Sequence, residues 1–169
     1  YIDRYSEPPS QEDARRSLDV RSDFLFLFFG RIREYKQVPE LIRAFKQLDS
    51  SQSTLIIAGN PASERLKRTL LTHTEDNDDI ETRLEFISDS EVSTYFAAAD
   101  TVVLPYRDIL TSGSAILAMS YSCPVVVPRL GCMPNLIENE VDGFLYNPET
   151  AGSLKQAMET ALGADCRKI

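Results

Sequence analysis

A short loop rich in hydroxyl groups holds the residues best suited to bind an anion. The tetrapeptide Thr111-Ser-Gly-Ser114 follows an apolar run at 101–104 and precedes good helix formers at 115–119. This order predicts a buried strand, a loop and a helix that begins at Ser112 or Ser114. Because a helix N-terminus presents free N–H groups and the positive end of its dipole, the loop predicts a site for a phosphate-like anion. Capping by Ser and Thr explains the same residues without a ligand.

A second loop carries concentrated positive charge. Gly30 ends an apolar run at 24–29, and three cations follow within six residues, from Arg31 to Lys36. The run is apolar at every position, which is typical of parallel strands buried on both faces. In an open parallel sheet, ligands bind beyond the carboxyl ends of the strands, where the loop at 111–114 is expected. Ordinary surface cations are the alternative for the second loop, since charged side chains are mostly exposed.

Strands and helices alternate along the rest of the chain. Strands are expected at 24–29, 54–58, 84–87, 101–104, 125–127 and 143–146. Helices are expected from Pro39 to Leu48, at about 63–73, from Ser88 or Ser90 to Ala99, from Ser112 or Ser114 to Ser122, and at about 150–162, with one helical turn at 135–138. This alternation predicts one α/β domain, Rossmann-like, with a doubly wound and mainly parallel sheet of about six strands.

The first 22 residues differ in composition from the rest of the chain. They are polar, and Ser10 and Asp13 have the spacing of a capping box, which predicts a short helix to about Leu18. We therefore divide the chain into a lead-in helix or interdomain linker at 1–22 and a domain at 23–169. The chain begins at Tyr1 without a methionine, so we expect a fragment or a processed piece. The acidic stretch at 74–82 is expected to be a surface loop.

Charge and composition exclude several classes of function. The net charge of −8 argues against a broad nucleic-acid surface, and no apolar run approaches the ~20 residues that span a membrane. Three cysteines, Cys123, Cys132 and Cys166, lack metal-like spacing, and their odd number favours reduced thiols in the cytoplasm. With His73 as the single histidine, we expect neither a zinc site nor a histidine-dependent triad.

Several short motifs occur in an order that is typical of one enzyme family. They are Phe29-Gly-Arg with Lys36 five residues later, Ile57-Ala-Gly-Asn60, Glu85-Phe-Ile-Ser88, Ala98-Ala-Asp-Thr-Val-Val-Leu-Pro105, Ala118-Met with Pro124-Val-Val, and Gly131 to Glu138 followed by Asp142-Gly-Phe. In these motifs the chain resembles the C-terminal, nucleotide-sugar-binding half of a GT-B glycosyltransferase, and most of all the retaining group often called family 4. The resemblance covers about residues 24–162.

The resemblance implies a role for each loop. Arg31 and Lys36 would hold the diphosphate of a nucleotide-diphospho-sugar together with the amides near Gly113, without a metal ion or a cofactor. Fixed cations and backbone donors would stabilise the charge on the leaving group. Phe86 and Ile87 would contact the base, although both residues could instead be strand core.

The resemblance also implies that an acceptor-binding domain lies upstream, which would carry any membrane contact, and that this chain alone does not catalyse transfer. The chain departs from the family pattern at two positions that normally hold glutamates, here Ile109 and Leu117. The first glutamate would touch the transferred sugar, and Asp108 is close enough to replace it. The second would bind the ribose, and Ser114 and Tyr121 could supply hydroxyls on the helical face of Leu117.

Two other classes of function are compatible with the sequence. The missing glutamates allow a non-catalytic module that binds a sugar nucleotide or phosphate. A flavodoxin-like regulatory domain is the third reading, but Gly30-Arg31 stands where a metal-dependent phosphoacceptor would need acidic residues.

Overall fold

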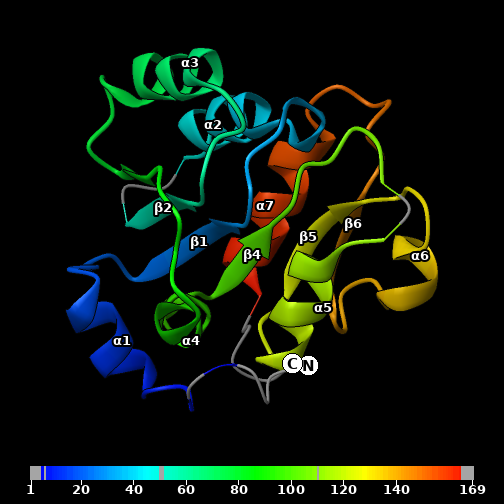
Figure 1. The fold of residues 1–169 in the computed structure, drawn as a ribbon. Coiled ribbons are helices and arrows are strands. Elements are labelled where there is room, and N and C mark those ends of the chain that lie inside the picture. Colours follow the sequence, from blue (N-terminus) through cyan, green and yellow to red (C-terminus); the bar gives the residue numbers. More distant parts are fainter. Residues whose placement is uncertain (1–4, 6, 50–51, 110, 165–169) are drawn as a thin grey trace.

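The fold is a three-layer α/β domain built on one parallel sheet. The computed structural model describes residues 5, 7–49, 52–109 and 111–164, so Cys166 lies outside the described residues. The strands are β1 (Phe24–Phe29), β2 (Ser53–Ala58), β3 (Ile80–Arg83), β4 (Thr101–Val103), β5 (Val125–Pro128) and β6 (Gly143–Tyr146). They pair in the order β3-β2-β1-β4-β5-β6, and every pair is parallel (Figure 1). The predicted fold class is therefore confirmed.

Helices cover both faces of the sheet. On one face lie α2 (Val38–Lys46), α3 (Glu64–Thr74) and α7 (Ser153–Gly163); α7 packs against β5 and β6 and is seen behind β4 in Figure 1. On the other face lie α4 (Asp89–Ala98) and α5 (Gly113–Ser120), and α1 (Gln11–Ser17) packs against α4. A single turn, α6 (Met133–Leu136), follows β5 at the edge of the molecule.

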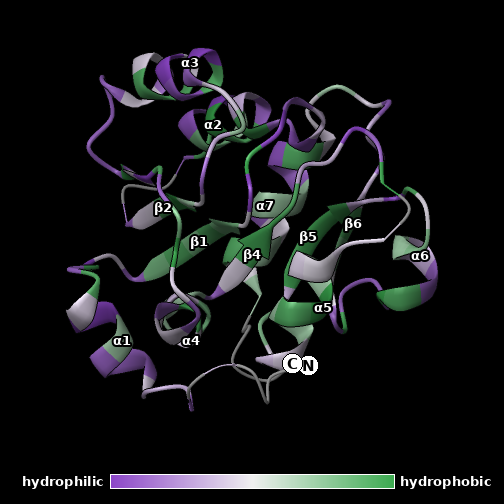
Figure 2. Cartoon of the chain, in the orientation of Figure 1, coloured by the Kyte–Doolittle hydropathy of each residue, from purple (hydrophilic) through white to green (hydrophobic). Residues whose placement is uncertain are grey.

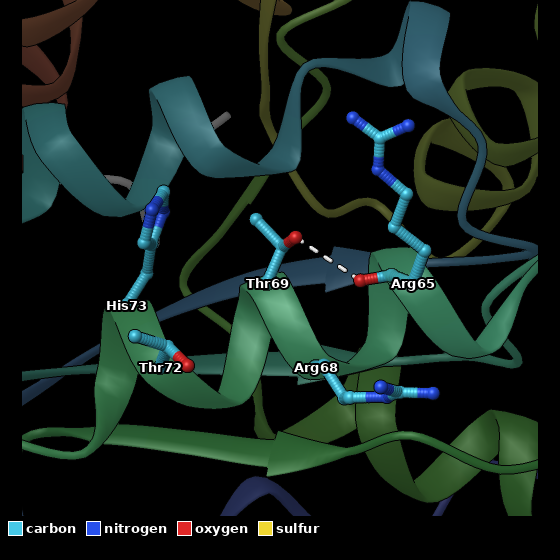
Figure 3. A pocket seen from close by; sticks show the side chains of 5 residues that line it. All are labelled: Arg65, Arg68, Thr69, Thr72 and His73. Carbon is cyan, nitrogen blue, oxygen red and sulfur yellow. Dashed lines mark hydrogen bonds between the residues drawn. The ribbon is translucent and has the colours of Figure 1, made fainter.

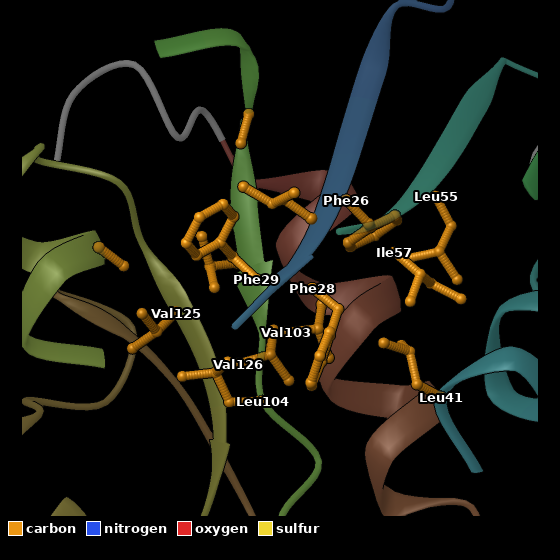
Figure 4. Close-up of a cluster of buried hydrophobic side chains, with 14 of the residues drawn as sticks. Phe26, Phe28, Phe29, Leu41, Leu55, Ile57, Val103, Leu104, Val125 and Val126 are labelled. Carbon is orange, nitrogen blue, oxygen red and sulfur yellow. The ribbon is translucent and has the colours of Figure 1, made fainter. Parts of the chain in front are cut away.

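The phenylalanine-rich strand β1 joins the two layers of helices. Side chains alternate along a strand, so Phe26 packs on Phe45 of α2, with 6.1 Å between ring centroids, whereas Phe29 packs on Phe96 of α4 at 5.0 Å. Figure 4 shows this cluster, in which Phe26 and Phe28 are fully buried. Figure 2 shows the same division for the whole chain, with apolar strands inside and polar outer faces on the helices.

Three serines define the N-terminal ends of helices, as the sequence predicts. Ser10 accepts a hydrogen bond from the amide of Asp13 at 3.1 Å and begins α1. Ser88 precedes α4, and its amide donates to the Glu91 carboxylate at 3.2 Å, which completes a capping box. Ser112 precedes α5 and belongs to the site described below.

Two predicted boundaries are wrong. The third strand is Ile80–Arg83, which overlaps the end of the stretch that was expected to be an acidic loop, whereas residues 84–88 form the connection to α4. The reason is that β3 lies at the edge of the sheet, where only Ile80 is buried, so polar residues are tolerated there and hide the strand in the sequence. The short helical turn after β5 also begins two residues earlier than expected, at Met133.

An ion pair joins α1 to the start of the sheet. The guanidinium of Arg15 pairs with Asp100, and both side chains are largely buried. Asp100 also accepts the amide of Leu25 at 2.7 Å, and Arg15 donates to the carbonyl of Ala98 at 3.1 Å. The described part of the lead-in segment is therefore fixed to the domain at the amino-terminal ends of β1 and β4, and the site described next lies at their carboxyl ends.

Candidate anion-binding site

Two loops meet where the strand order changes direction. The order 3-2-1-4-5-6 places the switch point between β1 and β4, and ligands of such sheets bind beyond the carboxyl ends of these strands. The loop after β1 and the loop after β4 are joined here, because the amide of Arg107 donates to the carbonyl of Tyr35 at 2.8 Å. The ring of Tyr35 also meets the ring of Tyr106 edge to face at 6.1 Å. The two loops therefore hold each other in place.

Two glycines let the backbone approach closely at this point. Gly30 has φ +123°, and a Cβ atom there would lie 2.9 Å from Oγ of Ser114 and 3.4 Å from Nζ of Lys36. At Gly59, which follows β2, a Cβ atom would lie 2.0 Å from the carbonyl oxygen of Gly30. Side chains at either position would therefore fill the space in front of α5 or push β1 away from β2.

Lys36 is the most unusual residue of the site, because it is a lysine that is only 9% exposed. It ends the 3-10 turn Glu34–Lys36, and its ammonium lies 5.8 Å from the ring centre of Phe28 and 5.2 Å from that of Tyr106. Among the residues that the structure describes, no carboxylate pairs with it. Burial, with a smaller contribution from Arg33, lowers the pKa of Lys36 to about 8.

The N-terminus of α5 faces this lysine across Gly30. Ser112 caps the helix by accepting the amide of Ala115 at 3.1 Å, and it is only 4% exposed, so its hydroxyl serves the helix first. The same hydroxyl donates to the phenol oxygen of Tyr106 at 3.4 Å. Burial raises the pKa of Tyr106, which keeps it neutral. The Ser114 hydroxyl stays beside Gly30, next to the amides of the first helical turn.

A cavity of about 430 Å³ connects these groups. Every residue of its lining comes from the loop after β1 or from the stretch between the end of β4 and the first turn of α5: Tyr35, Lys36, Tyr106, Asp108, Ile109, Thr111, Ser112, Gly113 and Ser114. The volume is within the range of small-molecule sites, ~300–1,000 Å³. The ammonium of Lys36 is buried, pairs with no carboxylate of the described residues and lies opposite the positive end of a helix, which makes the cavity suitable for an anion.

The structure brings some of the predicted residues together and leaves others apart. Six of them line the cavity: Lys36, Asp108, Thr111, Ser112, Gly113 and Ser114, with Gly30 next to the last. Arg31 is exposed and is not part of the lining. Phe86 is 76% exposed and Ile87 is half-buried, in the connection after β3, and they are not strand core. Leu117 is buried in α5 and lies outside the lining.

Two tyrosines of the site were not predicted. Tyr35 and Tyr106 connect the two loops, and both line the cavity. The sequence marks these tyrosines only weakly as site residues, because each stands alone in a polar stretch. Position offers a better signal, since each tyrosine follows a strand that leads to the switch point.

A second hollow lies on the outer side of α3 and is a poor candidate for a site. It is lined by residues of this helix alone: Arg65, Arg68, Thr69, Thr72 and His73. Figure 3 shows that Arg65 and Arg68 point to different sides of the helix, so the two guanidinium groups do not converge. Among the described residues, no group of three or more potential metal ligands comes together, and no helix is both long and apolar enough to cross a membrane.

Comparison with known proteins identifies the family. Residues 23–164 match the family model described as Glycosyl transferases group 1. The chain belongs to this family. Its sequence is 30% identical over 134 residues to the GDP-mannose:glycolipid 4-beta-D-mannosyltransferase of Xanthomonas campestris, an alignment that covers 78% of this chain and 38% of that protein. The chain thus spans less than half of the length of this glycosyltransferase.

Two solved structures have the same fold as this chain. Anabaena HepE, in complex with UDP and glucose, has a TM-score of 0.80 at 24% identity over 99% of this chain and 46% of its own. The C-terminal domain of a glycosyl transferase group 1 family protein, LpcC from Francisella tularensis, has a TM-score of 0.78 at 21% identity over 95% of this chain and 85% of its own. The fold is therefore that of a C-terminal GT-B domain.

Proposed function

We propose that this domain binds a nucleotide-diphospho-sugar and forms the donor half of a glycosyltransferase. The observation that carries the proposal is the buried ammonium of Lys36, which pairs with no carboxylate in the described part of the chain and lies opposite the N-terminus of α5, in a chain that belongs to glycosyl transferases group 1. The diphosphate would lie between Lys36 and the amides at Gly113 and Ser114. Arg31 would reach the outer side of the same diphosphate, and Phe86 and Ile87 would contact the base.

The proposed reaction requires stabilisation of a leaving group. The bond between the anomeric carbon and the terminal phosphate oxygen breaks, and the oxygen of an acceptor hydroxyl, which gives up its proton, bonds to that carbon. The nucleoside diphosphate departs with one more negative charge. Lys36 and the amides of the first turn of α5 line the cavity and would stabilise that charge, so the step as we propose it uses neither a metal ion nor a cofactor. Asp108, exposed on the lining, would contact the transferred sugar.

The rest of the proposal concerns the complete protein. A second Rossmann-like domain would bind the acceptor, a glycan or a lipid-linked sugar, and the catalytic cleft would lie between the two domains. Transfer of a hexose with retention of anomeric configuration is what the resemblance to family 4 implies, and NMR of the product's anomeric proton tests it. We further propose that the protein acts in the cytoplasm, with any membrane contact in the other domain.

Titration calorimetry with UDP, GDP and ADP tests the proposal on the 169-residue chain. We expect one of the three to bind, and Lys36→Ala to weaken its binding by about 10- to 100-fold, the value of a charge-assisted contact. Arg31→Ala should weaken binding less, since Arg31 is exposed. Arg68→Ala on α3 is a matched control that should change nothing. If none of the three nucleotides binds, the proposal is wrong.

A non-catalytic binding module is the second candidate. Ile109 and Leu117 are both buried and apolar where the family pattern has glutamates, so the usual carboxylates are absent from this site. Both candidates bind the nucleotide, and turnover separates them. A glycosyltransferase restored with its acceptor domain hydrolyses or transfers the donor sugar, whereas a binding module does neither. We expect no turnover from the 169-residue chain by itself.

A further inference from the structure

Tyr35 has features that phosphate binding does not explain. Its side chain is 41% exposed, which is unusual for a large aromatic residue, and yet it lines the anion cavity. It directly precedes Lys36, but the two side chains lie at different depths, with Lys36 buried and Tyr35 at the mouth. A diphosphate held by Lys36 needs no aromatic ring there, so Tyr35 is suited to another part of the ligand.

The ring of Tyr35 is held in one orientation before any ligand arrives. The carbonyl of Tyr35 accepts the amide of Arg107 at 2.8 Å, and the ring contacts Tyr106 at an interplanar angle of 64°. Tyr106 is itself buried and bonded to Ser112. A preorganised ring loses little conformational freedom on binding, and Tyr35 remains 41% exposed, so a ligand can reach it.

The cavity changes character between its floor and its mouth. At the floor, Lys36 and the first turn of α5 supply positive charge and amide donors. Toward the mouth, the exposed Tyr35 supplies an aromatic ring and the exposed Asp108 supplies a carboxylate that forms no ion pair within the described ranges, while the buried Ile109 adds apolar surface to the lining. A pyranose ring has matching features, with apolar C–H faces and hydroxyl groups around its edge.

We infer that Tyr35 is a specificity residue that stacks on the donor's pyranose ring when the diphosphate occupies the floor of the cavity. The electron-rich face of an aromatic ring attracts the weakly positive C–H groups of a sugar face. This inference rests on the proposed function and adds the residue that recognises the sugar itself. It predicts that Tyr35 contributes to the binding of a sugar nucleotide and contributes little to the binding of the nucleotide alone.

The test compares paired ligands on the wild-type 169-residue chain and on Tyr35→Ala. In titration calorimetry, UDP is paired with UDP-glucose, GDP with GDP-mannose, and ADP with ADP-glucose. We expect Tyr35→Ala to weaken the binding of the preferred sugar nucleotide by about three- to tenfold, the value of an aromatic contact, and that of its nucleotide by less than twofold. Tyr35→Phe should bind both ligands as the wild type does, because the ring and not the hydroxyl is needed.

Controls separate failure of this inference from failure of the proposed function. Leu71→Ala removes a side chain of similar exposure, 44%, on the distant helix α3 and should change neither affinity. If Tyr35→Ala weakens both ligands equally, Tyr35 only shapes the loop and the inference is overturned while nucleotide binding stands. If the wild type binds the nucleotides and Tyr35→Ala loses no sugar nucleotide affinity, the inference is also overturned. If the wild type binds none of the ligands, the proposed function itself is wrong.

Discussion

The low pKa of Lys36 makes ligand binding depend on pH in a range where few other groups titrate. In the folded chain without ligand, Lys36 has a pKa of about 8, and only its charged form can pair with a diphosphate. About nine-tenths of the free sites are charged at pH 7 and about one-tenth at pH 9. Because apparent affinity scales with the competent fraction, nucleotide affinity should fall about tenfold between these pH values. A phosphomonoester titrates near pH 6, below this range.

Calorimetry at pH 7, 8 and 9 with the nucleotide that binds best would measure this fall. Lys36→Arg keeps its charge throughout, because a guanidinium titrates above about pH 12, so its affinity should be nearly constant. Lys36→Met should bind weakly and equally at the three values. A wild-type affinity that is constant from pH 7 to pH 9, or a Lys36→Arg affinity that falls as steeply as the wild type, would refute the reasoning.

The same residue should cost stability in the absence of ligand. The pKa of Lys36 is lower in the folded chain than the ordinary 10.5, so the unfolded chain binds the proton more tightly between these values. The free energy of unfolding therefore rises as the pH increases above 8, by up to about 1.4 kcal/mol per pH unit. At neutral pH, burying the charged Lys36 lowers the free energy of unfolding by about 3 kcal/mol. Urea unfolding of Lys36→Met at pH 7 should show a gain approaching this value and no such rise between pH 8 and 9.5. Lys67→Met, on the surface of α3, is the control.

Two further substitutions test the architecture around the site. Gly30→Ala places a Cβ atom 2.9 Å from Oγ of Ser114, at a φ of +123°. We expect nucleotide affinity, measured by calorimetry, to fall at least tenfold and the free energy of unfolding to fall by about 1–3 kcal/mol. Gly163→Ala is the control and should leave binding unchanged, because a Cβ atom there has nothing within 4 Å. Asp100→Ala leaves the largely buried Arg15 without the carboxylate that it pairs with. It should lower the free energy of unfolding in urea by about 3 kcal/mol and leave nucleotide affinity unchanged. An unchanged unfolding midpoint would show that the ion pair does not fix α1.

The central strands could be predicted because they are buried on both faces. Phe24–Phe29 is apolar at every position, and its place between β2 and β4 follows from that burial. The edge strand Ile80–Arg83 could not be predicted in this way, since one face and one edge meet solvent and its sequence reads as a loop. Helix starts were easier, because Ser10, Ser88 and Ser112 cap through local bonds that do not depend on tertiary structure.

The two candidate cations illustrate the limit for the site. Arg31 and Lys36 occur in one loop, and the sequence gives no physical reason to treat them differently. The structure separates them, because Ile32 turns inward and forms a bridge with Pro61, which leaves Arg31 on the surface. Lys36 is buried only because the rings of Phe28 and Tyr106, 78 residues apart in the chain, come together around it. Contacts of such long range are not visible in local patterns.

The features that local rules fail to explain gather in one place. Lys36 is buried with no carboxylate partner among the residues that the structure describes, Gly30 has a backbone conformation that other residues rarely adopt, and the exposed Tyr35 lines a charged cavity. Under the proposed function a bound diphosphate would supply the counter-charge for Lys36, Gly30 would leave room for it, and Tyr35 would contact the attached sugar. Departures of this kind are expected at functional sites, where stability is given up for binding. Their convergence on the switch point between β1 and β4 is therefore stronger support for a ligand site than any one of the residues alone.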